Sequence, residues 1–277
     1  MSGLGLFIGP RRWSLCLLMV LLFCKILTGC ANAPTAGQSS DGRSDLVTDS
    51  DETNARKRAR IRVELAMGYL EQGKSTIALD EVKLALAADP DFADAYSLRG
   101  LIYMRLNELT LAQESFLKAL AIRPRDPNIL HNLGWLKCQQ ARYSEALADF
   151  SGALASPSYG ERAKTYMAQG LCQIRAGQRR EAEQSLLKAY EYDAGNPVTG
   201  YNLANLLFQN SEFARAQFYI RRLNNSEWAN AESLWLGIKV ENRLADRVAL
   251  LQLANQLEKR FPQSKEASAY RRGAFDE

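Results

Sequence analysis

Residues 93–126 read ADAYSLRGLIYMRLNELTLAQESFLKALAIRPRD. Two small residues, Gly100 and Ala112, lie where a pair of helices has to approach closely, and Phe116 is one of the large side chains that fill the gaps between them. Pro124 ends the second helix, because proline cannot continue a helix and biases the preceding residue away from helical geometry. The stretch therefore predicts two short helices packed against each other.

The same pattern recurs along most of the chain. Pro90 and Pro124 lie 34 residues apart, and Gly134 and Gly170 follow Gly100 at nearly the same spacing. A repeat of this length predicts a solenoid, in which each helix pair covers the next. The expected repeats span 59–92, 93–126, 127–162, 163–196, 197–229 and 230–263, followed by a cap at 264–277. Within the cap, an amphipathic segment at 265–272 would cover the apolar edge of the last pair.

The 34-residue pattern resembles the tetratricopeptide repeat (TPR), and the resemblance covers about residues 59–263. It implies an all-α fold, with about six helix-turn-helix repeats and a C-terminal capping helix wound into a right-handed superhelix. The chain departs from the pattern at Arg99, where leucine is usual, and in two extra residues near the end of 127–162. Ala194 and Trp228 replace the closing proline of two later repeats, which makes the boundaries of the last repeats less regular.

The N-terminus has the layout of a secretory signal. Arg11 and Arg12 precede an apolar run at residues 13–24, and Leu27-Thr28-Gly29-Cys30 resembles a bacterial lipobox. The resemblance implies a signal peptide at 1–29 and a mature chain that begins with lipidated Cys30, on the periplasmic face of the outer membrane because Ala31 follows. The alternative is an ordinary signal peptide or an anchor helix that contains a cysteine.

A polar tether is expected after the lipid, at residues 30–58. Its composition is small, polar and acidic, which leaves too little apolar surface to fold. The whole chain has 35 basic and 31 acidic residues, but removal of Arg11, Arg12 and Lys25 with the leader leaves 32 basic ones. A nearly neutral mature chain gives no support to a nucleic-acid partner. The basic cluster at 56–58 is interpreted as the solvated start of a helix.

No catalytic motif is present. The sequence has one histidine, His131, and lacks a glycine-rich phosphate loop, a metal-ligand spacing of Cys and His, and a nucleophile elbow. We therefore predict that the protein is not an enzyme and has no cofactor, metal or small-molecule substrate. His131 is interpreted as a surface or groove histidine without a chemical role.

A protein-binding groove is the expected functional site. In the TPR fold, the first helix of each pair lines the concave face, and most residues at the groove positions are apolar here. Such a surface suits an amphipathic helix or strand of a partner; alternatively, some of these side chains are packed between neighbouring first helices. The predicted groove residues are Val63, Met67, Leu70, Leu101, Met104, Arg105, His131, Trp135, Met167, Leu171, Ile174, Tyr201, Asn205 and Phe208.

Two cysteines remain once the leader and the lipidated residue are set aside. Cys138 and Cys172 both lie near the ends of first helices that stack side by side, and Cys138 also falls on a groove position. In an oxidising periplasm a disulfide between them would close a loop of about 34 residues, which stabilises a fold by roughly 3–4 kcal/mol. Two buried free thiols are the alternative.

The whole arrangement resembles the type IV pilus biogenesis and stability lipoproteins of the PilF/PilW family. The resemblance rests on the lipobox, the tether, six repeats, the cysteine pair and the C-terminal run KRFPQSKEASAY at 259–270. It implies an outer-membrane pilotin, which binds the type IV pilus secretin subunit and promotes its outer-membrane localisation and multimerisation. Twitching motility and adhesion would depend on it, and the N-terminal lipid would hold it on the membrane.

Two other functions fit the same architecture. One is a TPR lipoprotein of outer-membrane β-barrel assembly, a family that also has a Phe-Pro-x-Ser motif at the end of a repeat, as at residues 261–264. The other is a scaffold for a peptidoglycan synthase.

Overall fold

The computed structural model describes residues 52–275, and every regular element in that range is an α-helix. The predicted signal peptide at 1–29, Cys30 and the tether as far as residue 51 lie outside the described residues. Between residues 52 and 275 no helix is both long and apolar enough to cross a membrane.

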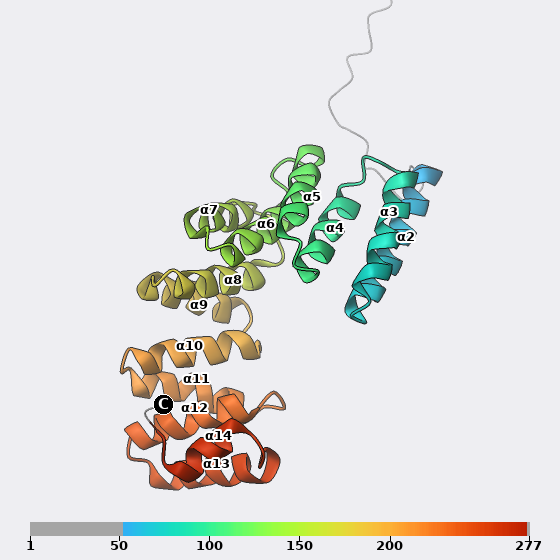
Figure 1. The fold of residues 1–277 in the computed structure, drawn as a ribbon. Coiled ribbons are helices and arrows are strands. Elements are labelled where there is room, and N and C mark those ends of the chain that lie inside the picture. The colour runs from blue at the N-terminus through green and yellow to red at the C-terminus, as the bar shows by residue number, and fades with distance from the viewer. Residues whose placement is uncertain (1–51, 276–277) are drawn as a thin grey trace, which may run out of the picture. The chain divides into compact units, whose positions relative to one another are not determined.

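Thirteen helices of the described range form six consecutive pairs and one final helix (Figure 1). The pairs are α2 (Asn54–Glu71) with α3 (Ser75–Ala88), α4 (Ala93–Arg105) with α5 (Leu109–Ile122), α6 (Pro127–Gln139) with α7 (Tyr143–Leu154), α8 (Arg162–Arg175) with α9 (Arg179–Tyr192), α10 (Pro197–Gln209) with α11 (Phe213–Asn224), and α12 (Ala231–Arg243) with α13 (Arg247–Arg260). The last helix is α14 (Lys265–Arg272).

The first helix begins before the first predicted repeat, which was placed from residue 59. Helix α2 starts at Asn54, and the side chain of Thr53 caps it by accepting a hydrogen bond from the backbone N–H of Arg56. Threonine is a favoured residue at this position because its oxygen satisfies a donor that the helix leaves unpaired. The basic cluster at 56–58 thus lies at the start of a helix, as interpreted from the sequence, whereas the predicted tether at 30–58 overlaps this helix from Asn54 onwards.

Small residues allow the two helices of a pair to approach, as predicted. A Cβ atom added at Gly134 would lie 2.9 Å from the ring of Phe150, and one added at Gly170 would lie 2.8 Å from Cγ of Leu186. These distances are shorter than carbon atoms in van der Waals contact allow. The partner side chains Phe150 and Leu186 are completely buried, so the glycines make room for the core of each pair.

The turn between the two helices of every pair contains one residue with a left-handed backbone. These residues are Gly73 (φ 77°), Asn107 (62°), Ala141 (58°), Gly177 (76°), Ser211 (63°) and Ala245 (59°). Four of the six are not glycine, although this conformation strains residues that carry a Cβ atom. The repeat pattern did not reveal this feature, because only two of the turns contain glycine at that position.

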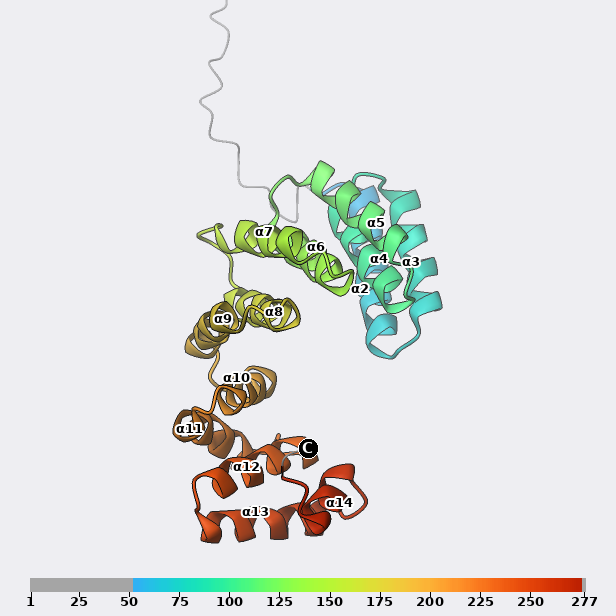
Figure 2. The same cartoon turned by 60° about the vertical axis from the view of Figure 1, so that its left-hand side comes forward.

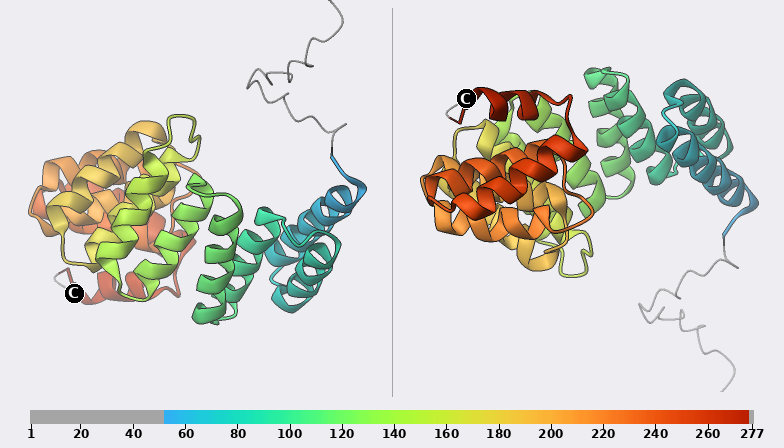
Figure 3. Two further views of the ribbon diagram at one scale, coloured as in Figure 1. Left: turned by 90° about the horizontal axis from the view of Figure 1, so that it is seen from above. Right: turned by 90° about the horizontal axis from the view of Figure 1, so that it is seen from below.

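The pairs stack in chain order. Apolar clusters join consecutive pairs; for example, Phe116 and Ala119 of α5 share a cluster with Ile129 and Leu133 of α6. In Figure 2, α6, α8, α10 and α12 lie on the inner side of the curve and α7, α9, α11 and α13 on the outer side. Seen from above and below, α2–α5 extend to one side of the later pairs (Figure 3).

The final helix covers the apolar end of the last pair, as expected from residues 265–272. Ala267 of α14 is fully buried and shares a cluster with Leu234, Ile238 and Leu257 of α12 and α13. Gly273 then ends α14 in a left-handed conformation, with φ of 67°. Solenoids need such a terminal cover, because the last repeat has no following repeat to bury its apolar edge.

Candidate functional site

An apolar pocket lies on the inner side of the curve, between α4, α6 and α8. Its volume is about 270 Å³. We call it the inner pocket, and the residues that line it are Leu101, His131, Asn132, Trp135, Lys164, Met167, Ala168 and Leu171. Five of these residues, from three separate repeats, are among the predicted groove residues. Residues that the repeat pattern placed at equivalent positions thus lie together at one concavity.

One face of α8 forms a stripe across the inner pocket. Lys164, Met167, Leu171 and Arg175 follow one another at intervals of three or four residues, which places them on the same side of a helix. Arg175 also lies over the ring of Trp135 from α6, with its guanidinium carbon 5.1 Å from the ring centroid. The stripe has a cation at each end and apolar side chains between.

His131 is buried at the inner pocket, with 7% of its surface exposed. Of the surface and groove positions proposed for it from the sequence, it occupies the groove position, because it lines the inner pocket. Its Nδ1 atom lies 2.8 Å from Oγ1 of Thr165, which also shares a hydrogen bond of 2.7 Å with the hydroxyl of Tyr159. Burial lowers the pKa of His131 to about 4, and the charge of Lys164 adds to the shift. The ring is therefore neutral at pH 7.

The irregular third repeat supplies this network. Tyr159 lies in the long connection between α7 and α8, where the sequence has its two extra residues, and only 6% of its surface is exposed. Burial raises the pKa of the Tyr159 hydroxyl. The longer connection thus brings an aromatic side chain over Thr165 and His131. The insertion was visible in the sequence, but its role was not.

The two cysteines lie beside the inner pocket, in the cluster that contains Trp135 and Ala168. Their Cα atoms are 5.8 Å apart and the structure joins their sulfur atoms, linking α6 to α8. This Cα separation lies in the usual range for disulfides. Cys138 is 1% exposed, so its side chain does not face the groove as its repeat position had suggested.

The rest of the predicted groove is more deeply packed. Val63 is buried in the N-terminal core, whereas Met67 is 48% exposed. Five others are half-buried and pack against apolar clusters, which agrees with the alternative that some of these side chains fill the space between first helices. They are Leu70, Met104, Ile174, Tyr201 and Phe208. Arg105 is exposed, and its guanidinium donates to the carbonyl oxygen of Leu70 at 3.1 Å.

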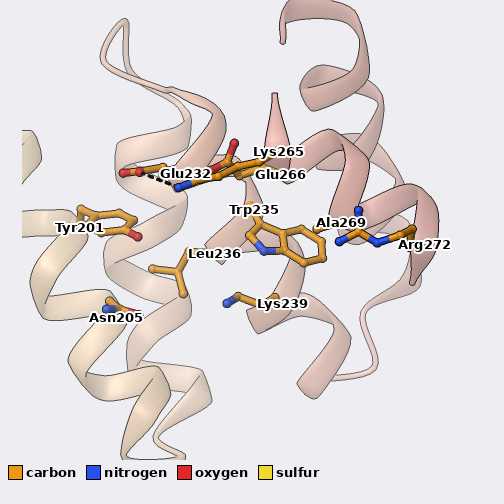
Figure 4. Close-up of a pocket in the computed structure, with 10 residues that line it drawn as sticks. All are labelled: Tyr201, Asn205, Glu232, Trp235, Leu236, Lys239, Lys265, Glu266, Ala269 and Arg272. Carbon is orange, nitrogen blue, oxygen red and sulfur yellow. Dashed lines mark ion pairs between the residues drawn. The ribbon is translucent and has the colours of Figure 1, made fainter. Parts of the chain in front are cut away.

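A second pocket lies near the C-terminal end, between α10, α12 and α14 (Figure 4). Its volume is about 360 Å³, and its lining residues are Tyr201, Asn205, Glu232, Trp235, Leu236, Lys239, Lys265, Glu266, Ala269 and Arg272. We call it the terminal pocket. Tyr201 and Asn205 were predicted groove residues, but the others were missed because the predicted groove ended at repeat five. Only the position of α14 across α12 would have revealed them.

Charges of both signs line the terminal pocket. Lys265 pairs with Glu232 at 3.8 Å and with Glu266 at 3.6 Å, as Figure 4 shows for the residues at one end. Lys239 lies 5.8 Å from the centroid of the Trp235 ring, and burial lowers the pKa of its amine. Burial also raises the pKa of Tyr201, and both glutamates add to that shift.

No group of His, Cys, Asp and Glu side chains within residues 52–275 is arranged to hold a metal ion. The terminal pocket contains two carboxylates, Glu232 and Glu266, and both pair with the amine of Lys265. The geometry of both pockets suits the binding of another molecule.

Comparison with known proteins decides the family. Sequence profiles of the tetratricopeptide repeat match residues 63–127, 115–148 and 163–196. The crystal structure of PilW, described as a widely conserved type IV pilus biogenesis factor, is 30% identical, with a TM-score of 0.70 over 76% of this chain and 97% of that one. The chain belongs to the PilF/PilW family.

Two further comparisons, both with PilF of Pseudomonas aeruginosa, support the same family. The type IV pilus assembly protein PilF of Pseudomonas aeruginosa is 29% identical over 90% of this chain and 94% of its own length. A solved structure of Pseudomonas aeruginosa PilF has a TM-score of 0.72 and covers 80% of this chain. The chain is thus a TPR protein of type IV pilus biogenesis, and such scaffold proteins are typically not enzymes.

Proposed function

We propose that the protein is an outer-membrane pilotin: it binds the type IV pilus secretin subunit and promotes its localisation and multimerisation. Membership of the PilF/PilW family supports a role in pilus biogenesis. The inner pocket supports a binding function, because apolar side chains from three repeats line one concavity there. The protein acts by binding alone and catalyses no reaction.

The inner pocket has the character of a protein-binding site. Aromatic anchors in central pockets provide much of the free energy of protein association, and Trp135 lines this one beside the apolar side chain of Leu101. Met167 adds a flexible thioether, which adapts to differently shaped apolar partners. A partner segment that buries one large apolar side chain there would be fixed in position by three repeats at once.

The lipid supplies the second half of the function. Cys30 is outside the described residues, and we propose that it is acylated. Two or three acyl chains, at about 0.8 kcal/mol for each buried methylene, hold a protein on a bilayer almost permanently. A secretin subunit bound at the inner pocket would then travel to the outer membrane together with its carrier.

Charged substitutions in the inner pocket test the binding role. We expect Trp135→Glu or Met167→Glu, expressed in a deletion strain, to reduce secretin multimers on denaturing gels at least about tenfold and to abolish twitching motility, since a carboxylate in an apolar interface costs several kcal/mol. The matched control is Leu117→Glu on α5, at a side chain that is already 50% exposed. Circular dichroism of each purified variant verifies folding.

The same strains separate the pilotin from the other functions. A deletion strain should keep normal porin levels and normal cell shape while it loses pili. Reduced porin levels with normal secretin multimers would instead indicate β-barrel assembly, and altered cell shape would indicate a peptidoglycan-synthase scaffold. Either result contradicts the proposal.

A further inference from the structure

We propose that the inner pocket selects an acidic segment of its protein partner, with two carboxylates about 16 Å apart on either side of a bulky apolar side chain. This inference rests on the proposed function, because it takes the inner pocket to be the site that binds a partner protein. The inference adds the chemistry of the partner segment that binds there. The carboxylates pair with Lys164 and Arg175 of α8, and the apolar side chain occupies the space between Trp135, Met167 and Leu171.

The first observation is an uneven distribution of charge between the two helices of the central pairs. The inner helices α4, α6 and α8 contain one acidic residue, Asp94, and it already pairs with Arg123. The outer helices α5, α7 and α9 contain six acidic residues: Glu114, Glu145, Asp149, Glu181, Glu183 and Glu191. The basic residues of the three inner helices are Arg99, Arg105, Lys137, Arg162, Lys164 and Arg175.

The second observation concerns which of these cations are already engaged. Lys137 pairs with Asp149 at 2.7 Å, and Arg99 donates to Oγ of Ser115 at 3.0 Å. In contrast, no carboxylate of residues 52–275 pairs with Lys164 or Arg175. Lys164 lines the inner pocket, and Arg175 is held over the Trp135 ring at its edge. Two cations without carboxylate partners thus border an apolar concavity.

The third observation is the spacing of the stripe. Lys164 and Arg175 are separated by 11 residues of one helix, and a rise of 1.5 Å per residue puts their Cα atoms about 16 Å apart. Met167 and Leu171 lie between them on the same face. A bound helix would match this distance with acidic residues about 11 positions apart, and an extended strand, whose side chains alternate between its two faces, would match it with about four or six.

The surroundings favour pairing with carboxylates. His131 is neutral at pH 7 because its pKa is about 4, so it neither attracts nor repels a carboxylate there. The walls of the pocket are mainly apolar, and ion pairs at the edge of an apolar site are stronger than pairs in open water because the local dielectric is lower. Charge complementarity of this kind gives specificity and a faster association.

Designed peptides test the inference directly. Three fluorescein-labelled helical peptides share central Phe and Leu residues and carry Glu, Gln or Lys at the two flanking positions. We expect the Glu peptide to bind about tenfold more tightly than the Gln peptide by fluorescence anisotropy, and the Lys peptide to bind most weakly. High salt should reduce the difference. Equal affinities for the Glu and Lys peptides, or no binding by any of the three, would overturn the inference.

Variants that remove the two positive charges test whether Lys164 and Arg175 cause the preference for the Glu peptide. Lys164→Gln combined with Arg175→Gln should remove the preference for the Glu peptide. The matched control is Lys118→Gln combined with Arg180→Gln, which makes the same charge change at exposed positions on the outer helices α5 and α9. A preference that survives the first pair of substitutions, or disappears with the control pair, contradicts the assignment to α8.

A parallel measurement with the purified secretin subunit keeps the two proposals apart. If Trp135→Glu abolishes secretin binding while the Lys164/Arg175 double variant binds as tightly as the natural protein, the pilotin function stands and the acidic-segment inference fails. If the Glu peptide is preferred at α8 but the secretin subunit does not bind, the inference about the site stands and the proposed partner is wrong.

Discussion

His131 links the buried network of the third repeat to the inner pocket. Its pKa of about 4 in the folded protein lies below the ordinary value of 6.5 because the ring is buried and Lys164 is near. The unfolded chain therefore takes up a proton at a higher pH than the folded protein does. The stability associated with the neutral ring is complete above pH 6.5 and is lost as the pH falls towards 4.

Acid should consequently weaken the fold through this one residue. From pH 7 to pH 5 we expect His131 to account for a loss of about 2 kcal/mol in the free energy of unfolding, measured by urea titration. His131→Gln, which can still bond to Thr165 but does not titrate, should lose correspondingly less over the same range. An identical pH dependence in the two proteins would show that His131 is not the group responsible.

Repeat spacing predicted some site residues correctly and missed others for identifiable reasons. Leu101, Trp135 and Leu171 line the inner pocket because each lies at the same place on a first helix. Val63 was misplaced because it packs into the N-terminal core, with 8% of its surface exposed. The burial of His131 was not predicted, because it depends on contacts with Thr165 and, through it, Tyr159 of an irregular loop rather than on the period.

The turns within the helix pairs are the elements with stored strain. Ala141 has φ of 58° and Gly177 has φ of 76° in equivalent turns. We expect Ala141→Gly to raise the free energy of unfolding by about 1 kcal/mol, since glycine adopts this conformation without a steric penalty. Gly177→Ala, the reverse change, should lower it by a similar amount. Urea unfolding measures both, and shifts of the same sign would contradict this explanation.

The link between α6 and α8 gives a second prediction for the elements. Replacing Cys138 and Cys172 together by serine should lower the free energy of unfolding by about 3–4 kcal/mol, as expected for a loop of about 34 residues. Alkylation of the unfolded natural protein without reductant should modify neither cysteine, as read by mass spectrometry. Labelling of both would establish two free thiols instead.

For the helices, the sequence predicted positions more accurately at the centre of the chain than at the two ends of the described range. The periodic glycine, alanine and proline residues located the helix pairs, since close packing demands small residues at fixed intervals. The first repeat was placed from residue 59 because residues 54–58 are polar and carry no repeat signature; the basic cluster at 56–58 indicated a helix start, but the Thr53 cap that begins α2 was not identified. The terminal pocket was missed because a short helix from outside the repeats completes it.

For the whole molecule, the decisive prediction is the attachment to the membrane. Cys30→Ser should leave the repeats folded and move the protein from the outer-membrane fraction to the soluble periplasm, because no acyl chain can then be attached. Fractionation and immunoblotting measure this change, and Cys16→Ser within the predicted leader is the control that should not alter it. A Cys30→Ser protein that still fractionates with the outer membrane would contradict the predicted anchor.

The link between α6 and α8 also bears on how the molecule comes apart. Helix pairs contact mainly their immediate neighbours, so opening can begin at either terminus and proceed pair by pair. The covalent bond joins two consecutive pairs in the middle of this series. Fraying that starts at α2 or at α14 would be halted there, so the region around the inner pocket would be the last to become accessible to a protease.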